Sequence, residues 1–272
     1  MSEATPLPAS TVVLVRDGAS GPEVLLLQRN LQSGFMPGMY LFPGGAVDQA
    51  DASAEAFALC VGLDDTAASS ALSMARGGLA NWVAAIREAF EEANLLIACD
   101  ARGDMIGPAA IAASDRFRAC REALNAGTGD FIGMLRAEGL TLPVDRLAFF
   151  SQWITPVGAP RRYDTRFFVA RAPEGQDALH DNVETVAYAW MHPAAALEGY
   201  RRGELKMRTP TWKTLERLAD FLSADELIGA LRRERPGPAL LPRIDKSGRR
   251  LLPGDPGYEE AGSPEGRGEW RT

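Results

Sequence analysis

Three glutamates within five positions are the residues of this sequence with the clearest chemical potential. Glu88, Glu91 and Glu92 lie in the segment AAIREAFEEANLLIA (84–98), where Arg87 is the adjacent cation. At about 100° per residue, the three side chains of a helix would share one arc of roughly 100°. Neighbouring carboxylates at this spacing repel each other by a few tenths of a kcal/mol per pair. A solvated acidic face tolerates that repulsion, whereas a hard cation such as Mg²⁺, which takes oxygen ligands, would remove it.

The glutamates must be presented by a helix with an apolar opposite face. Asn81 is a competent N-cap, so the helix is predicted to begin near Asn81 and to run to about Ala93. The buried stripe of this amphipathic helix would consist of Trp82, Ile86, Ala89, Phe90 and Ala93. We therefore expect the acidic face to be exposed on the side away from the core.

A glycine turn precedes the acidic helix. The segment LFPGG (41–45) predicts a short strand that ends in a Pro-fixed turn, and Gly44 and Gly45 are free to take a positive φ. Successive backbone N–H groups in such a turn can approach a phosphate closely. A glycine turn alone is a weak signal, but together with a three-glutamate helix it favours a site for a metal-bound phosphate.

The remaining segments predict a mixed α/β fold in which a helix crosses between strands. Residues 52–80 are alanine-rich and look helical, and the C-terminal stretch 236–272 is a Pro- and Gly-rich tail in which 246–248 could turn a small hairpin. Strands are predicted at 11–17, 23–30, 95–99, 147–156, 165–173 and 185–193, and helices within 111–139, at 211–222 and at 223–234.

Composition excludes several classes of protein. The chain has 272 residues, of which 46% are hydrophobic, and its net charge of −7 argues against a broad grip on nucleic acid. No window offers the roughly 18 apolar residues of a membrane span, and the N-terminus lacks the features of a signal peptide. Three distant cysteines indicate reduced thiols and a cytoplasmic location. With only two histidines, His180 and His192, a zinc site built on several histidines is excluded.

The residues of the glycine turn and acidic helix resemble the Nudix box, Gly-x5-Glu-x7-Arg-Glu-U-x-Glu-Glu-x-Gly-U, where U is apolar. Gly45 and the stretch 87–95 fit this pattern, and three positions depart from it. Asp51 replaces the usual glutamate, 35 residues (52–86) replace the usual seven, and Asn94 replaces the closing glycine. Asn94 is a mild departure, because asparagine is the next-best residue for the left-handed conformation at a helix end.

The position of the insertion makes residues 10–235 resemble the Nudix branch that includes peroxisomal and mitochondrial CoA diphosphatases. This resemblance implies an α/β/α sandwich with a mixed sheet, a helical insertion (52–80) and extra C-terminal helices. It also implies hydrolysis of CoA or acyl-CoA to 3′,5′-ADP and phosphopantetheine. The stretch SGFMPGMY (33–40) lacks the basic or histidine-containing segment of a related CoA signature. ADP-ribose, NADH or an oxidised nucleotide therefore stay open as substrates, as does a non-catalytic, ligand-binding Nudix-like module.

The resemblance assigns roles to the acidic helix. Glu88 and Glu92 are expected to be the first ligands of Mg²⁺, with Glu91 completing the set and Mn²⁺ as a second candidate cation. Arg87, Glu88 and Glu91 are the expected catalytic residues. Arg87 would orient a carboxylate, either Glu91 or one near the glycine turn, through a bidentate pair. A carboxylate of the cluster would take a proton from water, and the choice among the glutamates is open.

Residues outside the acidic helix supply weaker candidates. Gly44, Gly45, Arg29 and Arg166 are candidates for binding substrate phosphate, while Glu184 and Asp51 are candidate extra acids. The expected partner is a small nucleotide-type molecule, with no nucleic acid and no membrane. The insertion is interpreted as a lid or as a contact of a homodimer, and the sequence does not decide between the two.

Overall fold

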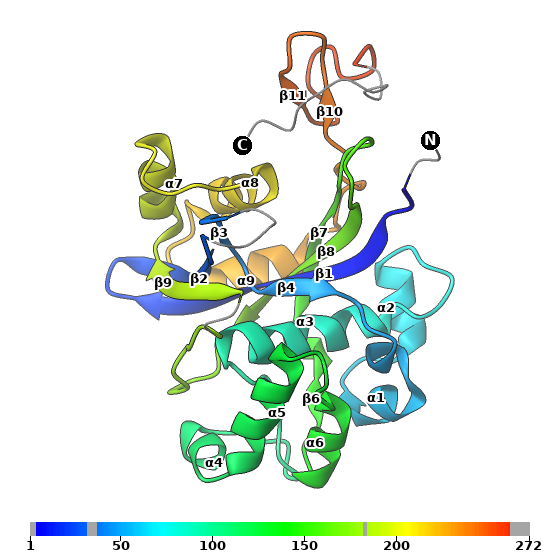
Figure 1. Ribbon diagram of the computed structural model, residues 1–272, viewed down its shortest axis with the longest axis vertical. Coiled ribbons are helices and arrows are strands. Elements are labelled where there is room, and N and C mark those ends of the chain that lie inside the picture. The colour runs from blue at the N-terminus through cyan, green and yellow to red at the C-terminus, as the bar shows by residue number, and fades with distance from the viewer. Residues whose placement is uncertain (1–3, 32–36, 182–183, 262–272) are drawn as a thin grey trace.

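A mixed sheet of seven strands forms the centre of the protein (Figure 1). The computed structural model describes residues 4–31, 37–181 and 184–261. The strand order is β3-β2-β1-β8-β7, with β4 paired to β1 and β9 paired to β2. The strands are β1 (Leu7–Gly18), β2 (Gly21–Arg29), β3 (Tyr40–Leu41), β4 (Gly44–Ala46), β7 (Ala148–Ile154), β8 (Tyr163–Arg171) and β9 (Thr185–Met191).

The two central strands separate from each other, and the glycine segment crosses between them. Near their hairpin β1 and β2 pair antiparallel, with Val15 opposite Val24. Further from the hairpin, Leu27 of β2 pairs with β3, whereas the first half of β1 pairs with β4, which places Ser10 opposite Gly45. The other edge of β1 pairs parallel with β8. The chain between β3 and β4 therefore bridges the gap between the central strands.

Helices cover both faces of the sheet, as Figure 1 shows. Side chains alternate along β1: Val12 and Leu14 join the core on one face, and Val13 and Val15 join the core on the other. Because both faces are buried, these strands are apolar throughout. The first face is covered by α1 (Ala54–Leu59), α2 (Asp65–Ala71), α3 (Leu79–Ala93), α5 (Asp115–Asn125) and α6 (Phe131–Ala137), with α4 (Pro108–Ala112) beside them. The second face is covered by α7 (Pro193–Arg201), α8 (Thr209–Leu218) and α9 (Ala224–Arg233). The expected α/β/α sandwich is thereby confirmed, although α7 was not predicted.

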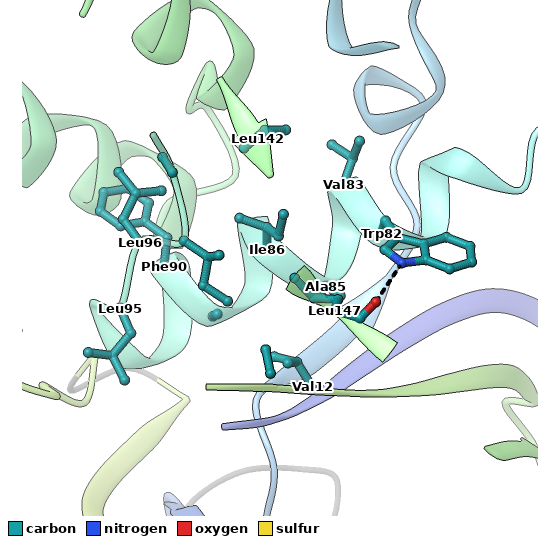
Figure 2. Close-up of a cluster of buried hydrophobic side chains, with 14 of the residues drawn as sticks. Val12, Trp82, Val83, Ala85, Ile86, Phe90, Leu95, Leu96, Leu142 and Leu147 are labelled. Carbon is teal, nitrogen blue, oxygen red and sulfur yellow. Dashed lines mark hydrogen bonds between the residues drawn. The ribbon is translucent and has the colours of Figure 1, made fainter. Parts of the chain in front are cut away.

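The acidic helix α3 is held by one of the two cores (Figure 2). The ring centroids of Trp82 and Phe168 are 4.7 Å apart, and Trp82 donates its Nε1–H to the carbonyl of Leu147. The helix begins at Leu79, two residues before the predicted start, so the prediction of Asn81 as N-cap was wrong. Asp65 of the insertion takes over the capping role, since its carboxylate accepts the backbone N–H of Leu79 at 3.0 Å.

Asn94 ends α3 in the left-handed conformation, with φ 60° and ψ 22°. The segment 95–99 that follows is buried but is not a strand of the sheet, so that prediction was wrong. A side chain takes the place of a strand partner: Gln176 accepts the N–H of Leu96 at 2.9 Å and donates to its carbonyl at 3.1 Å. An apolar run in the sequence indicates burial but does not identify the hydrogen-bond partner. It therefore could not reveal that a side chain replaces a neighbouring strand here.

The insertion and the tail contain regular structure. Residues 52–80 comprise α1, α2 and a short strand, β5 (Cys60–Val61), which pairs with β6 (Leu142–Pro143). In the tail, β10 (Arg243–Ile244) and β11 (Arg250–Leu251) form a hairpin around the predicted turn. Within the described ranges, no helix combines the length and apolarity needed to cross a membrane.

The conformation of Asn94 predicts a difference between two substitutions. Asn94→Ala should lower the free energy of unfolding by about 1 kcal/mol, because a Cβ-bearing residue without a local polar group resists a positive φ. Asn94→Gly should lie within about 0.5 kcal/mol of the parent, since glycine adopts this conformation freely. Urea unfolding followed by circular dichroism measures both. Equal losses for the two variants would contradict the role of backbone conformation at this helix end.

Candidate active site

Arg87 and Asp51 form a buried ion pair at the base of the site. Arg87 donates from Nε to Asp51 Oδ1 at 3.0 Å and from Nη2 to Oδ2 at 2.9 Å, in a bidentate arrangement. The exposed fractions of the two side chains are 6% and 1%. The backbone N–H of Asp48 also donates to Asp51, at 2.8 Å. The pair closes the loop that contains the insertion, because one partner precedes it and the other follows it.

The guanidinium of Arg87 also holds two of the three glutamates. Its Nη1 donates to Glu88 at 2.8 Å and to Glu91 at 3.1 Å, while Nη2 donates to the carbonyl of Ala46 at 2.8 Å. Sequence reasoning left open whether Arg87 pairs with Glu91 or with a carboxylate near the glycine turn, and Arg87 contacts both. The backbone carbonyl of Ala46 carries no side-chain signature, so the sequence could not have identified it as a partner.

The glycine bend lies directly against the acidic helix. The N–H of Gly44 donates to Glu92 Oε2 at 2.9 Å, and a Cβ built on Gly45 would lie 2.5 Å from Glu88 Oε1. Neither glycine has a positive φ, so the expectation that the turn needs glycine for its backbone conformation was wrong. A methyl group at Gly45 would displace the carboxylate of Glu88. At Gly44 a Cβ would lie 2.5 Å from the backbone carbonyl of Ser10.

The acidic face is mostly buried, contrary to expectation. Glu88 and Glu92 are each 7% exposed, and Glu91 is the more accessible, with 21% of its side chain exposed. The prediction failed because β4 covers this face of α3, and helix periodicity cannot reveal a strand that packs on the polar side. Asp48 was also missed by sequence reasoning: its carboxylate lies 3.6 Å from Arg87 Nη2 and remains largely exposed.

Burial changes the proton affinity of the glutamates. Desolvation raises the pKa of Glu88 to about 7, with Arg87 opposing the change and Glu91 adding to it. Desolvation also raises the pKa of Glu92 well above its ordinary value, and the charge of Glu88 adds to this, while the hydrogen bond from Gly44 opposes it. The pKa of Glu91 is raised by burial against the influence of Arg87. The pKa values of all three glutamates are raised, so the metal-free site disfavours their charged form.

Glu184, the candidate extra acid, lies beside the acidic helix. It precedes β9, and its charge contributes to the raised pKa values of Glu91 and Glu92. Its carboxylate pairs with Arg29 Nη2 at 2.9 Å, and its backbone carbonyl accepts the N–H of Asn30 at 2.8 Å. Arg29 thus contacts an acid of the site, and its predicted contact with substrate phosphate remains a prediction.

Arg166 lies further from the acidic helix. Arg166 lies on β8 and is 7% exposed, and its Nη1 pairs with Asp164 at 2.9 Å. The strand register places Arg166 beside Ser10, which in turn pairs with Gly45. Arg166 is therefore two strands away from the glycine bend, in the same row of the sheet, and its contact with phosphate also remains a prediction.

The donor chemistry of the site fits a hard divalent cation. The charges of Glu88 and Glu184 both act on Glu92, and within the described residues Glu92 has no cationic partner. Carboxylate oxygens are the ligands that Mg²⁺ prefers. Across the described ranges, no three histidine, cysteine or acidic side chains are already gathered as a metal-binding group. The residues thus supply the oxygen atoms and the uncompensated charge that a cation would satisfy.

An acidic helix held beneath a glycine bend on an α/β/α sandwich defines a Nudix domain. A solved structure, the Nudix hydrolase from Alicyclobacillus acidocaldarius, superposes with a TM-score of 0.65 at 28% identity, covering 86% of this chain and 99% of that one. The family model described as the NUDT19 Nudix domain matches residues 7–218, and the chain belongs to this family.

Two curated relatives are each named acyl-coenzyme A diphosphatase NUDT19. The Homo sapiens protein is 30% identical over 240 residues, covering 77% of this chain and 64% of the relative. The Gallus gallus protein is 31% identical over 241 residues, covering 75% and 63% respectively. The aligned part of this chain thus spans less than two thirds of the length of either relative.

The raised pKa of Glu88 predicts a pH dependence of stability in the metal-free protein. Between about pH 4.5 and pH 7 the folded protein keeps a proton on Glu88 that the unfolded chain has lost, so stability falls as the pH rises through this window. The loss of unfolding free energy attributable to Glu88 should be about 1–3 kcal/mol and should level off above about pH 7. Urea unfolding in excess chelator from pH 5 to pH 8 measures this dependence, and Glu88→Gln is the matched variant. Parallel curves for the parent and the variant would contradict the assignment.

Proposed function

We propose that the protein hydrolyses the diphosphate linkage of a nucleotide-type small molecule with the help of Mg²⁺, and that CoA or acyl-CoA is the substrate. The products would be 3′,5′-ADP and phosphopantetheine or its acyl form. The observation that carries this proposal is the contact of the glycine bend with Glu88 and Glu92 above the buried Arg87–Asp51 pair. The names of the NUDT19 relatives support the choice of substrate.

The reaction consists of attack by water on one phosphorus atom and cleavage of its bond to the bridging oxygen. Glu88, Glu91 and Glu92 would hold the cation, which when bound neutralises the diphosphate and lowers the pKa of water. Arg87 fixes Glu88 and Glu91 through its hydrogen bonds, while the N–H of Gly44 fixes Glu92. A carboxylate of this cluster would accept the proton of the attacking water.

The conditions of the reaction belong to the same proposal. Mg²⁺ is the proposed cation, with Mn²⁺ as its substitute, because both accept oxygen ligands. We place the protein in the cytoplasm on the basis of its three dispersed cysteines. Its charge of −7 supports a small-molecule partner over a nucleic acid. A membrane has no part in the proposal, and a homodimer remains a prediction from the sequence.

Glu92→Gln should abolish turnover and leave the fold intact. Loss of one ligand charge should lower kcat by at least about 10³-fold, which corresponds to about 4 kcal/mol. The amide oxygen can still accept the N–H of Gly44, and the neutral group is easier to bury, so metal-free stability should not fall. Steady-state hydrolysis of CoA and thermal unfolding measure the two effects. The matched control is Glu122→Gln, at an exposed glutamate of α5, which should retain full activity. Turnover by the Glu92 variant, or by the parent in excess chelator, would refute the proposed site.

A panel of diphosphates should rank CoA and acyl-CoA above ADP-ribose, NADH and oxidised nucleotides in kcat/KM. Mass spectrometry of the products in ¹⁸O-labelled water would identify the phosphorus atom attacked and the bond cleaved. If CoA and acyl-CoA are the slowest substrates, the diphosphatase chemistry stands and the substrate changes. If calorimetry detects tight binding of a nucleotide with metal present and no substrate of the panel is hydrolysed, the protein is a binding module.

A further inference from the structure

Arg121 on α5 binds the C-terminal turn of the acidic helix. Its Nε donates to the carbonyls of Phe90 and Glu91 at 3.1 and 2.9 Å, and its Nη2 donates to the carbonyl of Glu92 at 3.3 Å. The last carbonyls of a helix have no partner within the helix and form the negative end of its dipole. The carbonyl of Phe90 also accepts the N–H of Asn94 at 2.9 Å, so the guanidinium serves chiefly the carbonyls of Glu91 and Glu92.

The position of Arg121 follows from helix periodicity. Phe117, four residues earlier, is 4% exposed and belongs to the core beneath α3, so Arg121 lies on the same face of α5. Burial lowers the pKa of Arg121, which shows that this position is unfavourable for a charge, although Asp181 and Glu91 oppose the effect. An apolar residue would cover the same surface without this cost. The guanidinium is thus best explained by the carbonyl groups it binds.

Arg121 also holds the segment that leads to Glu184. Its Nη2 donates to the carbonyl of Leu179 at 2.6 Å, and the N–H of Leu179 donates to the carbonyl of Ala93 at 3.0 Å. Further along, the carboxylate of Asp181 accepts the N–H of Glu184 at 2.7 Å. Leu179 is thus held at the end of α3, and five residues later Glu184 is held by Asp181.

We propose that Arg121 is a positioning residue of the cation site, which fixes the segment carrying Glu184 against the turn carrying Glu91 and Glu92. This inference rests on the proposed function, because it assumes that a cation binds among these carboxylates. Arg121 acts through the backbone of both segments, so that Glu184 stays near Glu91 and Glu92.

Binding of Mn²⁺ to the full-length protein, measured by calorimetry and by electron paramagnetic resonance, tests this role directly. Arg121→Gln should weaken Mn²⁺ binding by about 10-fold, the loss typical when a group that orients metal ligands is removed. At saturating metal its kcat should stay within about threefold of the parent. The matched control is Arg118→Gln on the same helix, where Arg118 is exposed and pairs with Asp115. This control should bind Mn²⁺ like the parent.

A double-mutant cycle with Glu184→Gln separates positioning from general stabilisation. If Arg121 acts through Glu184, the double variant should bind Mn²⁺ no more weakly than Glu184→Gln alone. Additive losses, or unchanged binding in Arg121→Gln, would overturn the inference. Should Arg121→Gln fail to fold, Arg121→Lys replaces it in the cycle, since lysine keeps the charge but cannot span the same carbonyls. The proposed function fails separately, through hydrolysis that persists in Glu92→Gln.

Discussion

The buried ion pair between Arg87 and Asp51 is the interaction on which the arrangement of the site depends. Burying two charges is unfavourable unless their geometry is good and their remaining donors and acceptors are satisfied. Here the pair is bidentate, and Arg87 uses its other N–H groups on Glu88, Glu91 and the carbonyl of Ala46. One guanidinium therefore joins the strand that carries the glycine bend to the helix that carries the acids.

This ion pair also explains how the site accommodates a long insertion. Asp51 and Arg87 are 36 residues apart in sequence, yet their contact brings the two ends of the inserted segment together. The insertion then contributes to the helix it precedes, because Asp65 accepts the N–H groups of Gly77 and Leu79 at the start of α3. The helices of the insertion then pack in the same core as α3, to which α1 contributes Ala56 and α2 contributes Ala68.

The sequence was sufficient for elements with a local signature and insufficient for those that depend on distant partners. Apolar runs correctly located β1 and β2, and Asn94 was correctly assigned to the left-handed end of α3. The spacing of the glutamates correctly grouped them on one face of the helix. The prediction that the glutamates are exposed was wrong. The strand that covers them, β4, is distant in sequence and contributes backbone groups and no recognisable side chain. The true start of α3 was missed for the same reason, since its cap is supplied from α2.

The packing of α3 explains how a folded protein can tolerate three glutamates with raised pKa values. Apolar contacts of Trp82, Ile86 and Phe90 hold the helix in place independently of its acidic side. The cost of burying the charged carboxylates is consequently retained in the folded state, and Arg87 offsets only part of it at Glu88 and Glu91. A cation that binds these carboxylates would stabilise the charged form that burial disfavours, and the rigid helix would lose little conformational freedom on binding it. The apolar core beneath α3 thus keeps the glutamates in place although their burial is unfavourable.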